Sequence, residues 1–485
     1  MKILFVNPLI EPSSTIIQKI FSVVDEDLFS PMPLGILYLA AVAEKNGHVS
    51  FVENLHFTTV KKALKSIKPD LVAISAATPH YPQSEKIAIE IKKLIDVPII
   101  LGGYYPTFQW RHILEETNVF DYVFIGEGEK TFEEFLNRKA NSGIDNIPGI
   151  AYKKGSKIKY TGRRKLIRDL DSLPFPLRSG VRFKVPIILA SRGCFKNCSF
   201  CTIKNFYGGK LRLRNVDAVI DEISQMKRLG YKKIFFRDDN FPLNKGYLSK
   251  LMGGLRKNNL HNLEYSLMAD LNSIMDSEVL ELLKEMNVTM VSVGVQSTDE
   301  AFHNCMQTNI SLQKIKQFLK RICVYPFTVR VYLIVNALEI HNVPKIKKDI
   351  DNFFDALQRY SGGNCRFRPV PFMLDPFPGC DISGTSNIDK KEDMNLYRAE
   401  FCNIKNSLQC EKNIEDLFEY CIKRSYSFYP RGYGVYRVLL YACSLLLCDV
   451  SVGHRVQMIA NLVYDRLVAG YSSYQSRKRM YEKYF

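Results

Sequence analysis

The chain contains three cysteines, Cys194, Cys198 and Cys201, whose C-x3-C-x2-C spacing places three thiols within eight residues. Thiolates are soft ligands suited to zinc, copper(I) and iron–sulfur clusters. Structural zinc sites use four protein ligands from two paired half-sites, and no obvious fourth partner accompanies this compact triplet. Three cysteines around a four-iron cluster leave one iron open for a further ligand, which suits catalysis. The spacing therefore predicts an open iron–sulfur site.

An apolar run at residues 185–190 precedes the triplet and is typical of a buried strand. Strand-like segments at 186–190, 233–236, 263–268, 290–295, 328–335 and 366–373 then alternate with helix-like segments. These six βα-type units are too few for a closed eight-stranded barrel, so the pattern predicts an open, partial (β/α)6 barrel. Polar side chains follow several strands, where barrel enzymes keep their chemistry: Asp238, Asp239, Asp270, Gln296 and Asn336.

The first 140 residues alternate in the same way. Strand-like segments at 2–6, 49–53, 70–75, 98–101 and 121–125 are separated by helix-like segments at 33–46, 59–67 and 84–95. The pattern predicts an α/β, Rossmann-like parallel sheet covered on both faces. Ligands of such sheets lie beyond the carboxyl ends of the strands, where Gly102, Gly103, Gly126 and Gly128 fall. Glycine lets the backbone approach a ligand closely, although tight turns alone also explain these positions.

Two further regions complete the predicted domain organisation, in which the N-terminal domain covers 1–140 and the barrel 185–380. Residues 141–184 are expected to form a linker, with a short hairpin around Gly155 and a Leu-Pro-Phe-Pro break at 173–176. Residues 381–485 are rich in tyrosine and arginine, with helix-like stretches near 391–407, 413–423, 434–449 and 452–469. We expect a helical region there, related to substrate binding.

The net charge of +17 and the pI of 9.2 stand out in a composition otherwise ordinary for a soluble globular protein. A positive field favours anionic partners, and a well-solvated lysine-rich surface explains the charge equally well. The nine cysteines outside the triplet lack framework spacing and the N-terminus lacks signal-peptide features, so we expect a cytoplasmic protein. The apolar run at 438–448 is too short to span a bilayer, which leaves a core helix or a peripheral membrane contact.

The triplet, with aromatic Phe200 just before the third cysteine and a partial barrel behind it, resembles the radical S-adenosylmethionine (SAM) enzymes. In that family three thiolates hold a [4Fe–4S] cluster, and SAM binds the open iron and yields a 5′-deoxyadenosyl radical. The resemblance implies that Phe200 lies near the adenine and that Asp238 and Asp239 hold the SAM ammonium. Gln296 and Ser297 stand where related proteins often have a glutamate–serine pair, and the glutamine is a departure that removes a charge.

The N-terminal segment is similar to the cobalamin-binding domain of cobalamin-dependent radical SAM enzymes. Matching pieces lie at 33–40 (PLGILYLA), 69–75 (PDLVAIS), 102–107 (GGYYPT), 126–129 (GEGE) and 375–380 (DPFPGC), so the resemblance covers residues 1–380. It implies cobalamin contacts by Ser75, Ala77, Gly102 and Gly103 at the nucleotide tail, by Tyr105, Pro106 and Thr107 beside the corrin, and by Gly126 and Glu127. Family members often carry histidine where Tyr105 stands. The chain has no D-x-H-x-x-G motif, so no cobalt-ligating histidine is expected from that motif.

Together these features predict a cobalamin-dependent radical SAM enzyme that uses a [4Fe–4S] cluster, SAM and cobalamin. The leading hypothesis is methyl transfer to an unactivated carbon of a small-molecule or lipid-like substrate, with an external electron donor of flavodoxin or ferredoxin type. The first alternative uses the same cofactors for cyclisation, ring rearrangement or oxidation. The second is a non-catalytic iron–sulfur or cobalamin sensor, against which Asp238 and Asp239 argue. Nucleic acid ranks last, since no known RNA-binding module is found, and no catalytic acid, base or radical-relay residue is assigned.

Overall fold

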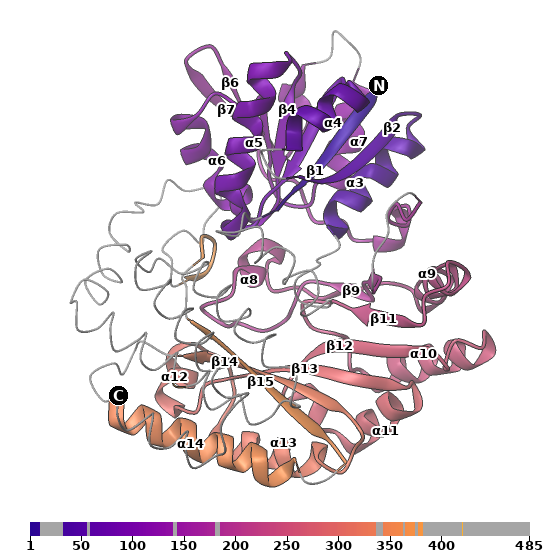
Figure 1. Cartoon of the computed structure of the whole chain (residues 1–485), viewed down its shortest axis with the longest axis vertical. Coiled ribbons are helices and arrows are strands. Elements are labelled where there is room, and N and C mark those ends of the chain that lie inside the picture. The colour runs from indigo at the N-terminus through magenta and orange to yellow at the C-terminus, as the bar shows by residue number, and fades with distance from the viewer. Residues whose placement is uncertain are drawn as a thin grey trace, which may run out of the picture.

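The computed structural model describes residues 1–9, 33–55, 59–138, 143–179, 185–335, 343–361, 364–373, 377–381 and 420. They form two α/β units that stack on each other (Figure 1). The unit drawn in indigo and purple contains a seven-stranded sheet, and the unit drawn in pink and orange contains a six-stranded sheet. The segment between β9 and α8, which carries the three cysteines, lies where the two units meet (Figure 1).

Five parallel strands form the centre of the N-terminal sheet, in the order β2-β1-β3-β4-β5. Their bounds are β1 Lys2–Pro8, β2 Val49–Leu55, β3 Leu71–Ser75, β4 Ile99–Gly102 and β5 Tyr122–Phe124. Lys2 of β1 lies opposite Val49 of β2, and Ile3 lies opposite Leu71 of β3, so the direction of winding reverses at β1 and β3. Doubly wound sheets bind ligands at the carboxyl ends of the strands beside such a reversal.

Helices cover both faces of this sheet because its strands direct successive side chains to opposite faces. Leu4 and Val6 pack with α4 (Val60–Ile67), α5 (Tyr81–Leu94) and α6 (Tyr104–Glu116). Ile3 and Phe5 pack instead with α3 (Leu34–Lys45) and α7 (Glu129–Asn137). The predicted α/β fold is confirmed. The sequence pattern predicts α3, α4 and α5 but misses α6 and α7, which begin directly after the glycine loops that end β4 and β5.

The segment expected as a linker instead continues the N-terminal sheet. β6 (Ile150–Lys154) pairs antiparallel with β5, and β7 (Lys157–Tyr160) pairs antiparallel with β6. The sequence predicts this hairpin but not its place at the sheet edge. Short 3-10 helices lie at η2 Thr78–His80, η3 Ile144–Asn146, η4 Leu170–Ser172 and η5 Ser273–Met275.

The second sheet has six parallel strands in the order β15-β14-β13-β12-β11-β8. Their bounds are β8 Ile187–Ile188, β11 Lys233–Phe236, β12 Glu264–Asp270, β13 Val288–Gln296, β14 Thr328–Val335 and β15 Arg366–Met373. Within the described residues β8 and β15 do not pair with each other, so the barrel is open, and the predicted partial (β/α)6 barrel is confirmed. A separate antiparallel ladder of β9 (Ser191–Arg192) and β10 (Arg212–Leu213) brackets the cysteines in the sequence.

Amphipathic helices pack against the barrel sheet and share one apolar core with it. They are α9 (Val216–Arg228), α10 (Lys245–Lys257), α11 (Ser277–Glu285), α13 (Leu312–Ile322) and α14 (Val343–Tyr360). Four of them begin at a polar cap whose side chain accepts a hydrogen bond from the first turn, at Asn215, Asn244, Asp276 and Ser311. Two shorter helices, α8 (Thr202–Tyr207) and α12 (Glu300–Cys305), flank the cysteine loop.

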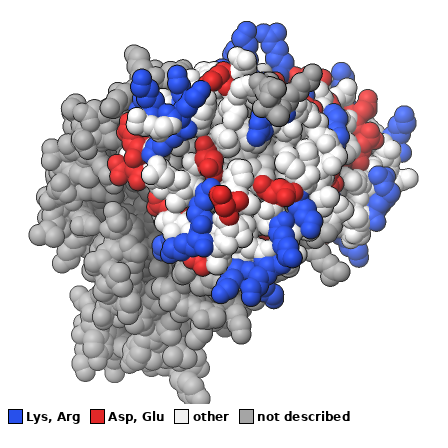
Figure 2. All heavy atoms as spheres, turned by 90° about the horizontal axis from the view of Figure 1, so that it is seen from above, with Lys and Arg blue, Asp and Glu red and all other residues white. Residues whose placement is uncertain are grey.

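The predicted C-terminal helical region, with its apolar run at 438–448, lies outside the described residues, apart from Asp381 and Tyr420. No helix in the described ranges has both the length and the apolar character needed to cross a bilayer. Figure 2 looks down on the N-terminal unit and shows Lys and Arg in separate groups, with Asp and Glu between them. The net charge of +17 is therefore not gathered into one continuous basic stripe on that face.

Candidate active site

The cysteine loop leaves β9 through Gly193, whose backbone φ is 90°. A Cβ atom at this position would lie 2.1 Å from the carbonyl oxygen of Lys210, so only glycine fits. The Gly193 N–H donates a 3.1 Å hydrogen bond to the carboxylate of Asp239, which follows β11. The turn therefore directs the loop from the β9–β10 ladder toward the carboxyl ends of the barrel strands.

The three thiols of Cys194, Cys198 and Cys201 are free, partly buried and line one cavity of about 170 Å³. Burial raises the pKa of Cys198 to about 11 and that of Cys201 to about 12, so binding of a metal centre must displace their protons. Three soft donors that converge on one cavity fit the [4Fe–4S] cluster expected from the sequence. Among the described residues no three His, Cys, Asp or Glu side chains are grouped for a single metal ion, whereas each ligand of a cluster binds a different iron.

Phe200 and Gln296, both predicted as SAM contacts, line the same cavity. The Phe200 ring stacks on Phe302 of α12, with ring centroids 6.4 Å apart. Gln296 ends β13 at a bulge with a φ of 70°, an uncommon conformation for a non-glycine residue that is often found at functional sites. Its amide folds back over Gly294, where an added Cβ would lie 2.0 Å from Nε2. The structure thus brings both residues to the cysteines, and their contact with SAM stays a prediction.

The two adjacent carboxylates after β11 face different surroundings. Asp239 lines the cysteine cavity, as a SAM ligand should. Asp238 is buried outside it, and its Oδ1 accepts hydrogen bonds from the Ala190 N–H (3.0 Å) and the Ser191 hydroxyl (2.6 Å). Burial raises the pKa of Asp238 to about 7 and that of Asp239 to about 6. Asp238 therefore supports β9, while Asp239 faces the cavity.

Ser297 also lies outside the cysteine cavity, because its hydroxyl turns toward the following loop and accepts a hydrogen bond from the Asp299 N–H. Several polar residues without a predicted SAM contact also line the cavity, among them Lys196 and Asp270. The Lys196 ammonium forms a 2.8 Å ion pair with Asp270, which ends β12. Burial would raise the pKa of Asp270, but hydrogen bonds from Lys196 and Ser273 hold it below its usual value. The position of Asp270 at a strand end is the sequence feature that could have identified it as a residue of this cavity.

A larger cavity of about 460 Å³ lies between the two units, at the carboxyl ends of the N-terminal strands. Six predicted cobalamin contacts line it: Ser75, Ala77, Gly102, Gly103, Gly126 and Glu127. The glycine at 103 is required by close backbone packing, since a Cβ there would lie 2.5 Å from the Ala76 carbonyl oxygen. Asp239 and Ile203 line this cavity and the cysteine cavity, so the two cavities share a wall.

The three residues predicted beside the corrin do not line the larger cavity. The Tyr105 ring stacks on Tyr81, with centroids 4.5 Å apart, and Pro106 is buried in the first turn of α6. The Thr107 hydroxyl donates a hydrogen bond to the Gly103 carbonyl and accepts one from the Gly126 N–H. The neighbouring Tyr104 lines the cavity instead, because consecutive helical residues point about 100° apart.

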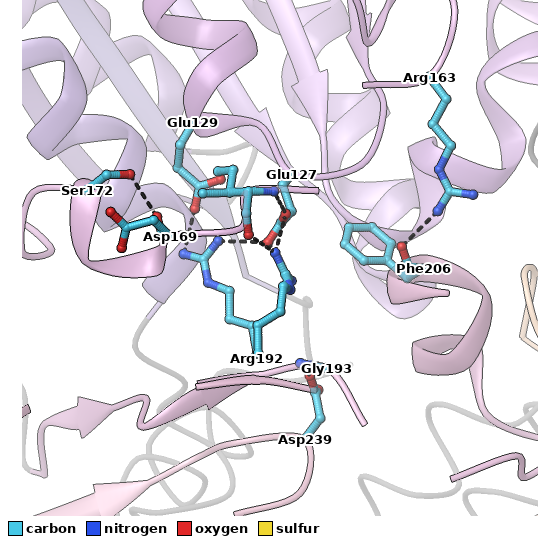
Figure 3. A network of polar contacts seen from close by, with 11 residues as sticks. Glu127, Glu129, Arg163, Asp169, Ser172, Arg192, Gly193, Phe206 and Asp239 are labelled. Carbon is cyan, nitrogen blue, oxygen red and sulfur yellow. Dashed lines mark hydrogen bonds and ion pairs between the residues drawn. The ribbon is translucent and has the colours of Figure 1, made fainter. Parts of the chain in front are cut away.

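Other lining residues were not predicted, among them Tyr38, Tyr104, Arg192 and Tyr207. Tyr104 of α6 and Tyr207 of α8 share a side-chain hydrogen bond across the two units, and burial raises the pKa of Tyr104 well above its ordinary value. Conversely, Glu127 does not offer a free carboxylate to a ligand. Its oxygens accept hydrogen bonds from Arg192, Arg212 and the Ile167 N–H, and Arg192 also pairs with Glu129 (Figure 3).

Two family models match the chain in the order of the two units. The model of the B12 binding domain matches residues 23–136, which include the strand ends that line the larger cavity. The model of the Radical SAM superfamily matches residues 188–348, which include the three cysteines.

The chain belongs to the radical SAM enzymes that carry a B12-binding domain.

Three cofactors follow from these two domains: cobalamin in the B12-binding domain, and a [4Fe–4S] cluster with SAM in the radical SAM barrel. The uncharacterized methyltransferase PH0819 of Pyrococcus horikoshii is 29% identical over 314 residues, or 61% of this chain and 66% of that relative. An anaerobic magnesium-protoporphyrin IX monomethyl ester cyclase of Cereibacter sphaeroides is 28% identical over 218 residues, or 40% of this chain and 35% of that relative. The matches thus cover less than two thirds of the length of either relative.

The solved structure of the radical SAM methyltransferase TsrM from Kitasatospora setae, with cobalamin and a [4Fe–4S] cluster bound, has the same fold. It matches with a TM-score of 0.60 at 17% identity, over 78% of this chain and 76% of TsrM. The radical SAM barrel and the B12-binding domain of this chain therefore have the arrangement of a solved two-domain structure.

Proposed function

We propose that the protein is a cobalamin-dependent radical SAM methyltransferase that acts on an unactivated carbon of a small-molecule or lipid-like substrate. The observation that carries the proposal is the wall shared by the two cavities, to which Asp239 and Ile203 contribute. A substrate carbon beside this wall would face the radical source on one side and the methyl carrier on the other. A relative described as a methyltransferase, which matches 61% of this chain, favours methyl transfer over other radical chemistry.

When bound, the cluster and SAM supply a 5′-deoxyadenosyl radical, and cobalamin carries the methyl group. The residues of this chain bind and orient these groups. Cys194, Cys198 and Cys201 would hold the cluster through their thiolates. Phe200 would contact the adenine of SAM, while the side chains of Asp239 and Gln296 would orient its polar end. Ser75, Gly102 and Gly103 would let cobalamin approach the strand ends closely.

The walls of the larger cavity also suit radical chemistry. Aromatic side chains from both domains close it, among them Tyr38 and Tyr104 from the B12-binding domain and Phe206 and Tyr207 from α8. Such walls exclude water and protect a reactive intermediate from side reactions. Apolar lining residues, including Leu34 and Leu189, would accept a substrate of low polarity.

The proposed reaction needs electrons from outside the chain, and we propose a one-electron donor of flavodoxin or ferredoxin type. The cysteine loop reaches the protein surface, since the side chain of Phe195, directly after Cys194, is 54% exposed. A partner that docks there would approach the cluster closely.

The test is anaerobic reconstitution with iron, sulfide and cobalamin, followed by SAM with a labelled methyl group, a strong reductant and candidate substrates. We expect corrin absorbance that survives desalting, formation of 5′-deoxyadenosine, and a labelled product. A modified but unlabelled product would indicate that the enzyme catalyses cyclisation or a related reaction instead of methyl transfer. If SAM left the electron paramagnetic resonance (EPR) signal of the reduced cluster unchanged, the enzyme proposal would fail.

A further inference from the structure

Glu127 of the B12-binding domain makes direct contacts with the strands that bracket the cysteine loop (Figure 3). Arg212 binds both of its oxygens, with Nη1 2.8 Å from Oε2 and Nη2 2.9 Å from Oε1, and Arg192 lies 3.2 Å from Oε1. Arg192 and Arg212 are partners across the β9–β10 ladder. Arg192 also reaches Glu129 at 2.6 Å. One carboxylate therefore ties both strands of this ladder to the domain above them.

A second arginine contact holds the other end of the cysteine loop. Arg163, which follows β7 in the extended N-terminal sheet, donates hydrogen bonds to the carbonyl oxygens of Asn205 (3.1 Å) and Phe206 (2.8 Å), as Figure 3 shows for Phe206. These carbonyls end α8, which begins directly after Cys201, and cationic side chains are favourable at helix C-termini. Residues of the N-terminal unit thus bind the chain on both sides of the cysteines.

The buried ion pairs favour the docked arrangement of the domains. The side chain of Glu127 is 4% exposed, and those of Arg192 and Arg212 are 9% and 11% exposed. Burial would raise the pKa of Glu127, but Arg212 and Arg192 hold it below its usual value, so the carboxylate is charged. A buried charge that loses its partners is costly, which makes any displacement of the two domains unfavourable unless water enters.

We infer that Glu127, paired with Arg212 and Arg192, is a positioning residue that fixes the B12-binding domain against the cysteine loop. This inference rests on the proposed function for its catalytic consequence, because a radical formed at SAM and a methyl group on cobalamin must meet the same substrate carbon. A small displacement of reacting groups lowers a rate strongly. The contacts of Glu127 with Arg212 and Arg192, called the clamp below, therefore determine the fraction of 5′-deoxyadenosyl radicals that lead to product. Glu127 does not take part in the chemistry itself.

The experiment compares Glu127→Gln and Arg212→Met with the control Glu134→Gln. Glu134 forms a bidentate pair with Arg164 at 2.9 and 2.5 Å, but both residues belong to the N-terminal unit, and neither lines the cysteine cavity or the larger cavity. Arg212 does not line the larger cavity, so Arg212→Met breaks the clamp without removing a ligand contact. Arg212→Lys keeps the charge without the two-pronged geometry and should give an intermediate effect.

The first readout is hydrogen–deuterium exchange of the protein without cofactors. The amide of Ile167 donates a hydrogen bond to Glu127. In Glu127→Gln and Arg212→Met, this amide and the amides of residues 191–194 should exchange about tenfold faster or more than in the unsubstituted protein. In Glu134→Gln they should exchange at the rate of the unsubstituted protein. The second readout is the rate at which bound cobalamin is lost on dilution, which should rise several-fold. The third is the ratio of 5′-deoxyadenosine to methylated product, which should rise about tenfold.

If hydrogen exchange or cobalamin loss in Glu127→Gln and Arg212→Met equalled that of Glu134→Gln, the inference would be overturned. A faster exchange with an unchanged product ratio would also overturn it, since the pair would then only stabilise the fold. If the unsubstituted protein forms no methylated product, the proposed function fails, and the clamp is judged by exchange and cobalamin loss alone. Circular dichroism and thermal unfolding establish that each variant is folded, and Arg212→Lys replaces Arg212→Met if the latter is not.

Discussion

Gly193 and Lys210 lie so close together that a single added methyl group at position 193 would collide with the Lys210 carbonyl oxygen, at 2.1 Å. The contact joins the start of the cysteine loop to the residue two positions before β10. It explains why the chain between these points returns to the same ladder, and it makes the position of the first cysteine depend on the absence of a side chain.

Gly193→Ala should lower the free energy of unfolding by about 2–4 kcal/mol, because alanine is strained at a φ of 90° and clashes with the backbone. Gly208→Ala is the matched control, since Gly208 also has a positive φ, 62°, but its added methyl group meets no atom within 4 Å. We expect the control to cost about 1 kcal/mol. Denaturant unfolding of both variants checks the prediction, and equal costs would contradict it.

Replacing Cys194, Cys198 or Cys201 individually by serine should abolish the bound cluster and the formation of 5′-deoxyadenosine. The physical reason is that all three thiols line one cavity, and a hydroxyl is a poor ligand for iron–sulfur clusters. Iron and sulfide content, together with cluster absorbance after reconstitution, measure the effect. Cys305→Ser is the control, because this exposed cysteine lies outside the cavity and its loss should leave the cluster in place.

Asp238→Asn should become more stable relative to the unsubstituted protein as the pH rises from 4 to 8. Burial raises the pKa of Asp238 to about 7, so the folded state keeps a proton that the unfolded state releases near pH 3.8. The stability contributed by this proton is present below pH 3.8 and is lost as the pH rises through 7. The relative gain should be about 4 kcal/mol, measured by denaturant unfolding across this range. A difference that does not change with pH would show that Asp238 is charged in the fold.

Gly294→Ala should weaken SAM binding about tenfold, which corresponds to about 1.4 kcal/mol, without loss of the cluster. The added methyl group would lie 2.0 Å from Nε2 of Gln296 and would push that amide out of its place in the cysteine cavity. Titration of the SAM-dependent change in the EPR signal of the reduced cluster gives the dissociation constant. An unchanged constant would mean that Gln296 does not contact SAM.

The buried His303 should make the fold less stable in mild acid. Its Nε2 lies 2.9 Å from the Ser297 carbonyl oxygen and its Nδ1 lies 2.7 Å from the Thr308 hydroxyl, and burial lowers its pKa. The unfolded chain therefore binds a proton as the pH falls through 6.5, while the folded protein resists protonation until a lower pH. Below pH 6.5, the free energy of unfolding should fall more steeply for the unsubstituted protein than for His303→Gln, by up to about 1.4 kcal/mol per pH unit. Parallel pH profiles of the two proteins would refute this.

Sequence periodicity predicts most of the architecture. The bounds of β11, β14 and β15 agree with the predicted segments, because these elements carry strong apolar patterns. The helices α6 and α7 escape prediction because each begins in a glycine-rich loop, and α6 carries a proline in its first turn. The sheet position of β6 and β7 depends on pairing with β5, which local sequence does not encode.

The candidate site shows the same division between local and long-range information. Sequence spacing alone identifies the three cysteines, whose separation is local. Which of two adjacent residues faces a cavity depends on the local course of the backbone, which spacing does not encode: Asp239 and Tyr104 line a cavity, whereas their neighbours Asp238 and Tyr105 do not. The partners of Glu127 lie 65 and 85 positions further along the chain, beyond the reach of any motif.

Those separations also bear on the order of assembly. Glu127 is synthesised before either of its arginines, and contacts between distant residues form slowly because the intervening chain must close first. Until β9 and β10 are made, Glu127 lacks its two arginine partners, and its carboxylate must stay hydrated. We therefore expect the N-terminal sheet to form early, the seam between the domains to close last, and a corrinoid to be captured by the whole chain rather than by the nascent first domain.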